Sequence, residues 1–97
     1  MPVYFIALID CPDERGGYVD YVEKVKPIVE SHGGTYIIRT ENITPIFSDW
    51  KPDRMIVIRF ATRESLDKCF SSSEYKEIMS LRTENVASRA LIVEGIE

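Results

Sequence analysis

Four segments rich in β-branched and aromatic residues predict the strands of this chain. They span residues 3–9, 35–40, 54–61 and 89–94, and the segment 54–61 has the clearest strand pattern. Residues 3–9 are apolar at every position, which is typical of a strand that lies between two layers.

Between the first two strands, apolar residues recur at spacings of three and four and predict an amphipathic helix from about Gly17. Its buried stripe consists of Tyr18, Tyr21, Val22, Val25, Ile28 and Val29. Gly33 and Gly34 are expected to end this helix, because glycine accepts the left-handed conformation found at helix ends.

Two further helical segments follow the third strand. Thr62 is a predicted N-cap, and the helix after it directs Leu66, Cys69 and Phe70 inward. Ser73 is the predicted cap of the next segment, which carries Tyr75, Ile78, Met79 and Arg82 on one face.

Residues 41–53 connect the second and third strands. Residues 43–47 are apolar enough to extend the second strand or to form a short hairpin, and residues 49–53 have the composition of a turn.

The resulting order is β-α-β-β-α-β, and it predicts an α+β fold of ferredoxin-like topology in a single domain, residues 1–97. Two interleaved crossover units give one antiparallel sheet with the helices on one face. The other face of the sheet is then left open.

Alternation along the strands divides their side chains between the two faces. Tyr36, Ile38, Ile56, Ile58 and Phe60 are predicted beneath the helices, which leaves Ile37, Met55, Val57 and half of the first strand on the open face. Such an apolar patch is larger than monomers usually expose. A two-fold copy would bury it, so the sequence predicts a homodimer, with a monomer that exposes this face as the alternative.

The same alternation places Arg39 and Arg59 on the open face, where Glu94 is a candidate to join them. A buried guanidinium needs a partner or an anionic ligand. Two interpretations stay open: salt bridges between subunits, for instance Arg59 with Glu41 or Glu94, or a pocket inside the dimer that binds a carboxylate or phosphate through Arg39.

Composition narrows the possible partners. The net charge of −4 argues against binding to nucleic acid, which needs concentrated Lys and Arg. With one histidine and two separated cysteines, Cys11 and Cys69, a protein-built metal site is not expected, and both thiols are predicted to be core residues. The apolar run 3–9 is too short for a membrane span and lacks the features of a signal peptide, so we expect a cytoplasmic protein without a cofactor.

Individual residues suggest chemistry without defining a catalytic constellation. His32 at the end of the first helix is expected to cap it, with general base as the alternative. Trp50 is a candidate pocket lid or a hydrophobic plug at the dimer rim. Tyr75 and Arg82 lie seven residues apart, two turns along one helix face, so they either present a hydroxyl and a cation to an anion or simply pack there.

A collective pattern extends over essentially the whole chain: Tyr21, Pro27, His32-Gly33-Gly34, Tyr36, Arg39, Trp50-Lys51-Pro52-Asp53-Arg54, Ser73-Glu74-Tyr75, Arg82 and Val93-Glu94-Gly95. In this pattern the chain resembles the family catalogued as domain of unknown function 1330. The resemblance implies a ferredoxin-like fold and membership of the dimeric α+β barrel superfamily, which includes cofactor-free monooxygenases, muconolactone isomerases and haem-dependent dismutases. It implies no reaction.

Two positions depart from the pattern of the family. Thr40-Glu41 follow Arg39 where two glycines are usual, and Arg59 precedes Phe60 where an acidic residue is usual. The second departure reverses the charge on the open face and would change which ligands a pocket there could bind.

These observations predict a homodimeric protein that binds or transforms a small anionic or aromatic molecule without a metal; whether it is an enzyme stays open. The predicted site lies between sheet and helices or inside the dimer. Its candidate ligand-binding residues are Arg39, Trp50, Arg59, Tyr75 and Arg82. The alternatives are a non-catalytic structural or regulatory dimer and, less favoured by the position of His32, a haem protein.

Overall fold

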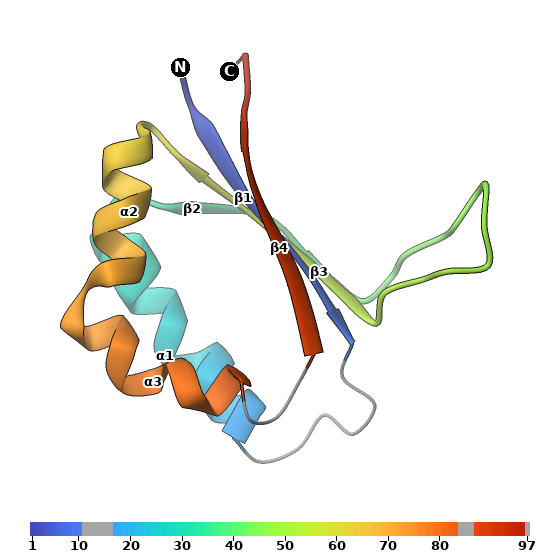
Figure 1. Ribbon diagram of the computed structural model, residues 1–97, viewed down its shortest axis with the longest axis horizontal. Helices are drawn as coiled ribbons and strands as arrows, with labels where there is room; N and C mark the ends of the chain where they lie inside the picture. The colour runs from blue at the N-terminus through green and yellow to red at the C-terminus, as the bar shows by residue number, and fades with distance from the viewer. Residues whose placement is uncertain (11–16, 84–86, 97) are drawn as a thin grey trace.

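The computed structural model describes residues 1–10, 17–83 and 87–96, and has the predicted ferredoxin-like α+β fold. The described elements are β1 (Val3–Asp10), α1 (Gly17–Ser31), β2 (Thr35–Thr40), β3 (Arg54–Phe60), α2 (Arg63–Ser71), α3 (Ser73–Thr83) and β4 (Ala87–Glu94). The sheet has the order β2-β3-β1-β4, and each neighbouring pair is antiparallel. The three helices cover one face of the sheet (Figure 1). None of these helices is long and apolar enough to cross a membrane.

The two glycines after α1 end that helix, as the sequence predicts. Gly33 has a φ of +84°, and its N–H donates to the Glu30 carbonyl at 3.1 Å while the N–H of Gly34 donates to the Val29 carbonyl at 2.9 Å. This pair of bonds is the Schellman motif. Nδ1 of His32 lies 2.9 Å from the Ile28 carbonyl oxygen, which can only accept, so this ring nitrogen donates and His32 caps the helix.

Gly34 is predicted to be the more sensitive of the two glycines. A Cβ at Gly34 would lie 2.5 Å from Cγ1 of Val29 and 2.9 Å from Cζ of Phe60, both in the core, whereas one at Gly33 would meet nothing within 4 Å. We expect Gly34→Ala to lower the free energy of unfolding by about 1–3 kcal/mol through overpacking. Gly33→Ala, the matched control, should cost about 1 kcal/mol through its left-handed backbone alone. Urea unfolding of both variants checks this, and an equal loss would contradict it.

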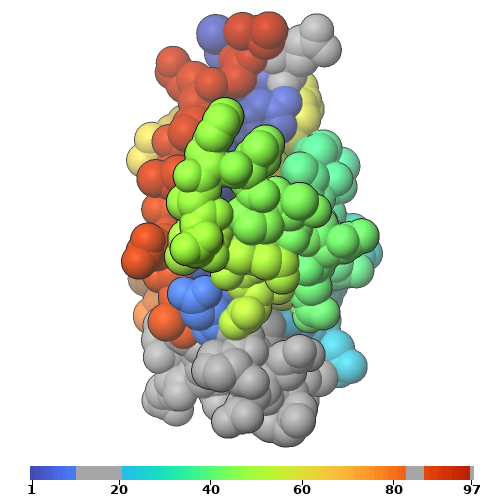
Figure 2. All heavy atoms as spheres, turned by 90° about the vertical axis from the view of Figure 1, so that its right-hand side faces the viewer, coloured from blue at the N-terminus to red at the C-terminus, as the bar shows by residue number. Residues whose placement is uncertain are grey.

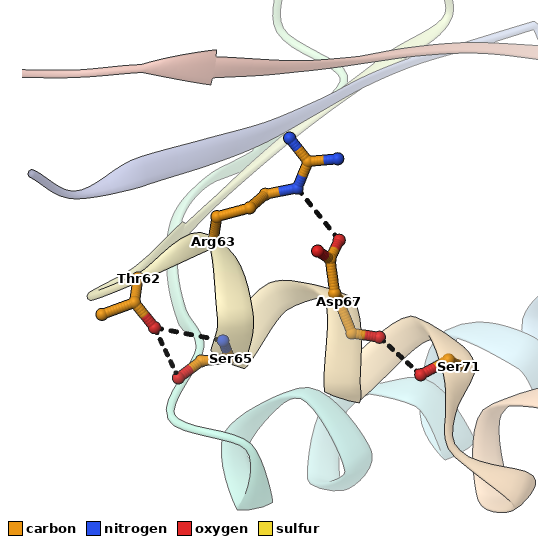
Figure 3. Close-up of polar contacts among 5 residues, drawn as sticks. All are labelled: Thr62, Arg63, Ser65, Asp67 and Ser71. Carbon is orange, nitrogen blue, oxygen red and sulfur yellow. Dashed lines mark hydrogen bonds and ion pairs between the residues drawn. The ribbon is translucent and has the colours of Figure 1, made fainter.

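Serine and threonine hydroxyls begin both helices after β3. Oγ1 of Thr62 accepts from the Ser65 N–H at 3.1 Å, which confirms the predicted N-cap (Figure 3). For α3 the prediction was wrong by one residue: Ser73 is already helical, and the Ser72 hydroxyl instead accepts from the Tyr75 N–H at 3.2 Å. Ser72 has the extended backbone that an N-cap needs, with φ −67° and ψ 153°.

The side of the sheet that faces the helices carries the core. Val3, Phe5 and Ala7 of β1 pair with Phe60, Ile58 and Ile56 of β3, which confirms the predicted face for these three β3 residues. The largest completely buried side chains are Phe60, Ile9, Leu66, Val29 and Cys69. Burial of Cys69 agrees with the prediction, whereas Cys11 lies outside the described residues.

Burial raises the pKa of the Cys69 thiol from its ordinary value of 9.0 to about 11, and the charge of Glu74 adds to this shift. Well below pH 9 the thiol is protonated in folded and unfolded chains alike, so its titration leaves stability unchanged. As the pH rises towards 11, only the unfolded chain ionises, and the free energy of unfolding should fall by up to about 3 kcal/mol. Urea midpoints measured across this range should fall less steeply for Cys69→Ala, and parallel curves would refute the assignment.

The opposite side of the sheet, which we call the open face, is apolar as predicted. By register it presents Tyr4, Ile6, Leu8, Ile38, Met55, Val57, Leu91 and Val93, together with Arg59 and Arg89. Leu91 is 56% exposed, and Ile38 and Val93 are also exposed. This face therefore offers a large apolar surface on the side away from the helices.

An irregularity in β2 overturns the predicted positions of Ile38 and Arg39. The register shifts between Tyr36 and Ile38, so Ile38 pairs with Val57 on the open face and Arg39 pairs with Ile56 on the helix side. One extra residue in a strand reverses the faces of all residues after it.

The predicted place of Glu94 beside Arg59 is also corrected, while a salt bridge from Arg59 to Glu41 of a second subunit stays a prediction. Glu94 pairs in register with Val3 and shares the helix-side face, and Glu41 approaches Arg54 at 3.5 Å. Arg59 itself pairs with Tyr4 and Thr35 and keeps its predicted place on the open face.

Residues 41–53 form neither a hairpin nor an extension of β2, so both predictions for residues 43–47 are wrong. Pro45 lacks the N–H that a strand ladder requires, which accounts for the difference. Ile46 and Phe47 are 83% and 98% exposed.

Candidate ligand-binding cavity

A cavity of about 300 Å³ lies between the helix side of the sheet and helices α1 and α3. Each strand contributes to its wall, as do all three helices. Most of the lining is apolar: Phe5, Ala7, Ile9, Val25, Ile56, Ile58, Phe70, Met79 and Ala90. A volume of this size, with apolar walls, is at the lower end of the range typical of small-molecule sites.

Five polar side chains from four elements also line this cavity. They are Tyr21 from α1, Tyr36 from β2, Tyr75 and Arg82 from α3, and Ser88 from β4. The phenol oxygens of Tyr21 and Tyr75 share a hydrogen bond of 3.0 Å, and their rings meet edge to face. Nη1 of Arg82 donates to Oγ of Ser88 at 2.8 Å. Helix α3 is thereby tied to α1 and to the edge strand β4 by polar contacts within an otherwise apolar wall.

Periodicity explains how the cluster is built. Tyr75 and Arg82 are two turns apart on α3, so both extend from the same side of the helix. Tyr21 belongs to the buried stripe of α1 and is 7% exposed, and Tyr75 is 5% exposed. A buried tyrosine normally directs its hydroxyl to a polar partner, and here each hydroxyl supplies the partner of the other.

Electrostatics favour a neutral Tyr21 phenol beside a charged guanidinium. Burial and the neighbouring Tyr75 raise the pKa of Tyr21 well above its ordinary value. Burial alone would lower the pKa of Arg82, but charge and hydrogen-bond interactions with Tyr75 and Tyr21 outweigh it, and the pKa is raised. Arg82 is therefore a permanent cation at the cavity wall.

In the described part of this wall, the charge of Arg82 has no acidic counterpart. Among the described residues that line the cavity none is Asp or Glu, and none of the described carboxylates forms an ion pair with Arg82. Guanidinium and phenol groups donate hydrogen bonds, so the cluster suits an oxygen that accepts them, above all an anionic one. The described lining also lacks histidine and carboxylate, the side chains that most often act as general base.

The structure brings together two of the five residues predicted for the site, Tyr75 and Arg82. Arg39 lies over the ring of Tyr36 at 5.4 Å, on the helix side but outside the lining of the cavity. Arg59 and Trp50 are on the other side of the sheet, where the Trp50 ring is 5.8 Å from the guanidinium of Arg89. The five residues therefore do not form one site within a protomer.

Sequence reasoning missed Tyr21 and Ser88 as cavity residues. Tyr21 belongs to the apolar stripe of α1 and to the family pattern, and the signal that could have marked it as a site residue is its phenol, which in a buried stripe needs a polar partner nearby. Nothing in the sequence marks Ser88, because its role depends on how β4 lies beside α3.

Within the described part of the chain, no three His, Cys, Asp or Glu side chains are grouped as a metal site would require. The expectation that the protein works without a metal or cofactor remains a prediction from the sequence.

Comparison with known proteins establishes the family. Residues 2–96 match the family described as "Domain of unknown function (DUF1330)". The chain belongs to this family. No curated protein matches the sequence.

Solved structures of similar shape confirm the fold. A protein of unknown function from Rhodopseudomonas palustris is 19% identical with a TM-score of 0.81, over 99% of this chain and 83% of that one. A dimeric ferredoxin-like protein of unknown function from Jannaschia sp. is 11% identical with a TM-score of 0.71, over 98% and 100%. SnoaB, a cofactor-independent oxygenase from Streptomyces nogalater, is 7% identical with a TM-score of 0.68, over 99% and 94%. At these identities the likeness concerns the fold alone.

Proposed function

We propose that this DUF1330 protein is a cytoplasmic homodimer that binds a small, largely apolar molecule with one anionic oxygen in the cavity between sheet and helices. The observation that carries this proposal is Arg82, a cation beside two phenols in a largely apolar wall whose described residues include no acid. An apolar carboxylate or a phenolate fits both features. Its body would replace water against the apolar lining, and its charge would be paired with the guanidinium.

The dimer is proposed from the open face. The exposed Ile38 lies at the β2 margin of this face, the exposed Leu91 and Val93 lie at its β4 margin, and a second copy would cover all three. A stable interface would need to bury about 800 Å² of each protomer. The dimeric ferredoxin-like protein from Jannaschia sp., which shares the fold, supports the same arrangement here.

Two functional classes fit such a dimer. A catalytic role on the bound anion would parallel SnoaB, whose fold is similar and which acts as a cofactor-independent oxygenase. The other class is a non-catalytic dimeric module. The ligand site is the feature that separates the two classes, so it is the first to test.

The test is a thermal-shift screen of small aromatic and aliphatic carboxylic acids, each compared with its uncharged methyl ester. At a concentration ten times its dissociation constant, a bound acid should raise the melting temperature by about 6–10 °C. The matched ester should raise it much less, because it cannot pair with Arg82. If no acid is distinguished from its ester, the proposed recognition is wrong and the non-catalytic module is favoured.

A further inference from the structure

Residues 41–53, which we call the arm, leave the sheet on the side opposite to the helices. In Figure 1 the arm extends from the ends of β2 and β3 away from all three helices, and in Figure 2, seen from that side, it lies in front of the strands. Near its tip are two consecutive apolar residues, Ile46 and Phe47, which are 83% and 98% exposed. The tip therefore makes almost no contact with its own protomer.

The two ends of the arm, in contrast, are fastened to the sheet. The N–H of Asp53 donates to the Ile9 carbonyl at 3.0 Å, and the Asn42 N–H donates to Oγ1 of Thr40 at 3.0 Å. Glu41 approaches Arg54 at 3.5 Å, and the Trp50 ring lies over the guanidinium of Arg89 on the open face. These contacts hold the arm in a defined direction, so the exposure of its tip is a property of the fold.

The direction of the arm coincides with the side on which the proposed partner must lie. We propose that the arm packs against a second copy of this chain. Phe47 and Ile46 are then buried against the partner, and Trp50 is covered at the edge of the interface. This inference rests on the dimer proposed above. In a dimer held only by contact between the two sheets the arm has no role, whereas here it forms part of the interface.

Charge also favours a second copy as the occupant. The arm carries Glu41, Asp49 and Asp53 against a single cation, Lys51. The open face carries two cations, Arg59 and Arg89, against one carboxylate, Asp10 at the end of β1. When two open faces meet about a two-fold axis, the acidic arm of each protomer is brought to the cationic face of the other, so both contacts are favourable at once.

Trp50 makes the proposal directly measurable, because it is the one tryptophan in the sequence and is 47% exposed in the protomer. The unmodified protein is diluted in steps, and tryptophan emission is recorded in parallel with sedimentation velocity. We expect the emission of the dimer to be blue-shifted and to move to the red on dilution, with the same midpoint as dissociation. Phe47→Ser should raise the dissociation constant at least about tenfold, as for an aromatic anchor at an interface.

The substitution leaves the protomer intact, because a side chain that is 98% exposed contributes little to its own fold; circular dichroism should confirm this. Ile96→Ser, at another strongly exposed apolar residue outside the arm, is the matched control and should leave the dissociation constant nearly unchanged. If a dimer sediments while Trp50 emission stays water-like and Phe47→Ser dissociates like the unmodified protein, the arm proposal is overturned and the dimer stands. If only monomers sediment at every concentration, the dimer fails too.

Discussion

Arg82→Met is expected to weaken binding of an apolar carboxylate in the cavity by roughly a hundredfold, the value of a charge-assisted hydrogen bond of about 3 kcal/mol. Methionine keeps much of the apolar length of the side chain and removes its charge. The phenol pair of Tyr21 and Tyr75 does not need Arg82 for its own 3.0 Å hydrogen bond. Isothermal titration with the best acid from the screen and with its methyl ester measures the effect.

Two comparisons separate recognition from a general disturbance of the cavity. Affinity for the neutral ester should change little in Arg82→Met, so that the preference for acid over ester is lost. Arg39→Met removes the same charge from an exposed residue that does not line the cavity, and it should bind the acid normally. If Arg82→Met weakens binding of acid and ester equally, Arg82 does not recognise the carboxylate. The same conclusion follows if Arg39→Met weakens binding of the acid as much as Arg82→Met does.

Phe60→Ala is expected to produce the largest loss of stability, about 3–5 kcal/mol. The side chain is completely buried on the central strand β3, and its ring meets that of Phe70 edge to face. Truncation removes the apolar burial and leaves a void between the sheet and α2. Since domains of this size are stable by about 5–15 kcal/mol in total, the variant should be partly unfolded at modest urea concentrations.

Phe70→Ala is the matched control for this prediction. Phe70 is only half-buried and lines the existing cavity, so its removal enlarges a space that is already there. The loss at Phe70 should be clearly the smaller of the two in urea unfolding followed by circular dichroism. If Phe70→Ala loses more stability than Phe60→Ala, Phe60 does not have the central place in the core that its burial implies.

The order and type of the elements could be predicted because each has a local cause. Alternation and β-branching mark the strands, the apolar stripe marks α1, and Gly33 ends that helix through its left-handed backbone. Thr62 illustrates the same point at α2, since an N-cap is recognised from residues within one turn of each other.

The candidate site could be predicted only in part, because it depends on features that act over a longer range. A shift of register within β2 moved Arg39 to the helix side, and strict alternation gives no sign of such a shift. Tyr75 and Arg82 were identified together because they share one helix face. Tyr21 and Ser88 join them only because α1 and β4 pack against α3, and local sequence patterns do not predict this packing.

The register shift in β2 has a second consequence, for the way copies of the protein can meet. β2 lies at one margin of the sheet, where backbone N–H and C=O groups point outward and could pair with a strand of another molecule. An irregular spacing puts those groups out of step with any regular incoming strand. The irregular spacing therefore disfavours the addition of strands from other molecules at this margin of the sheet.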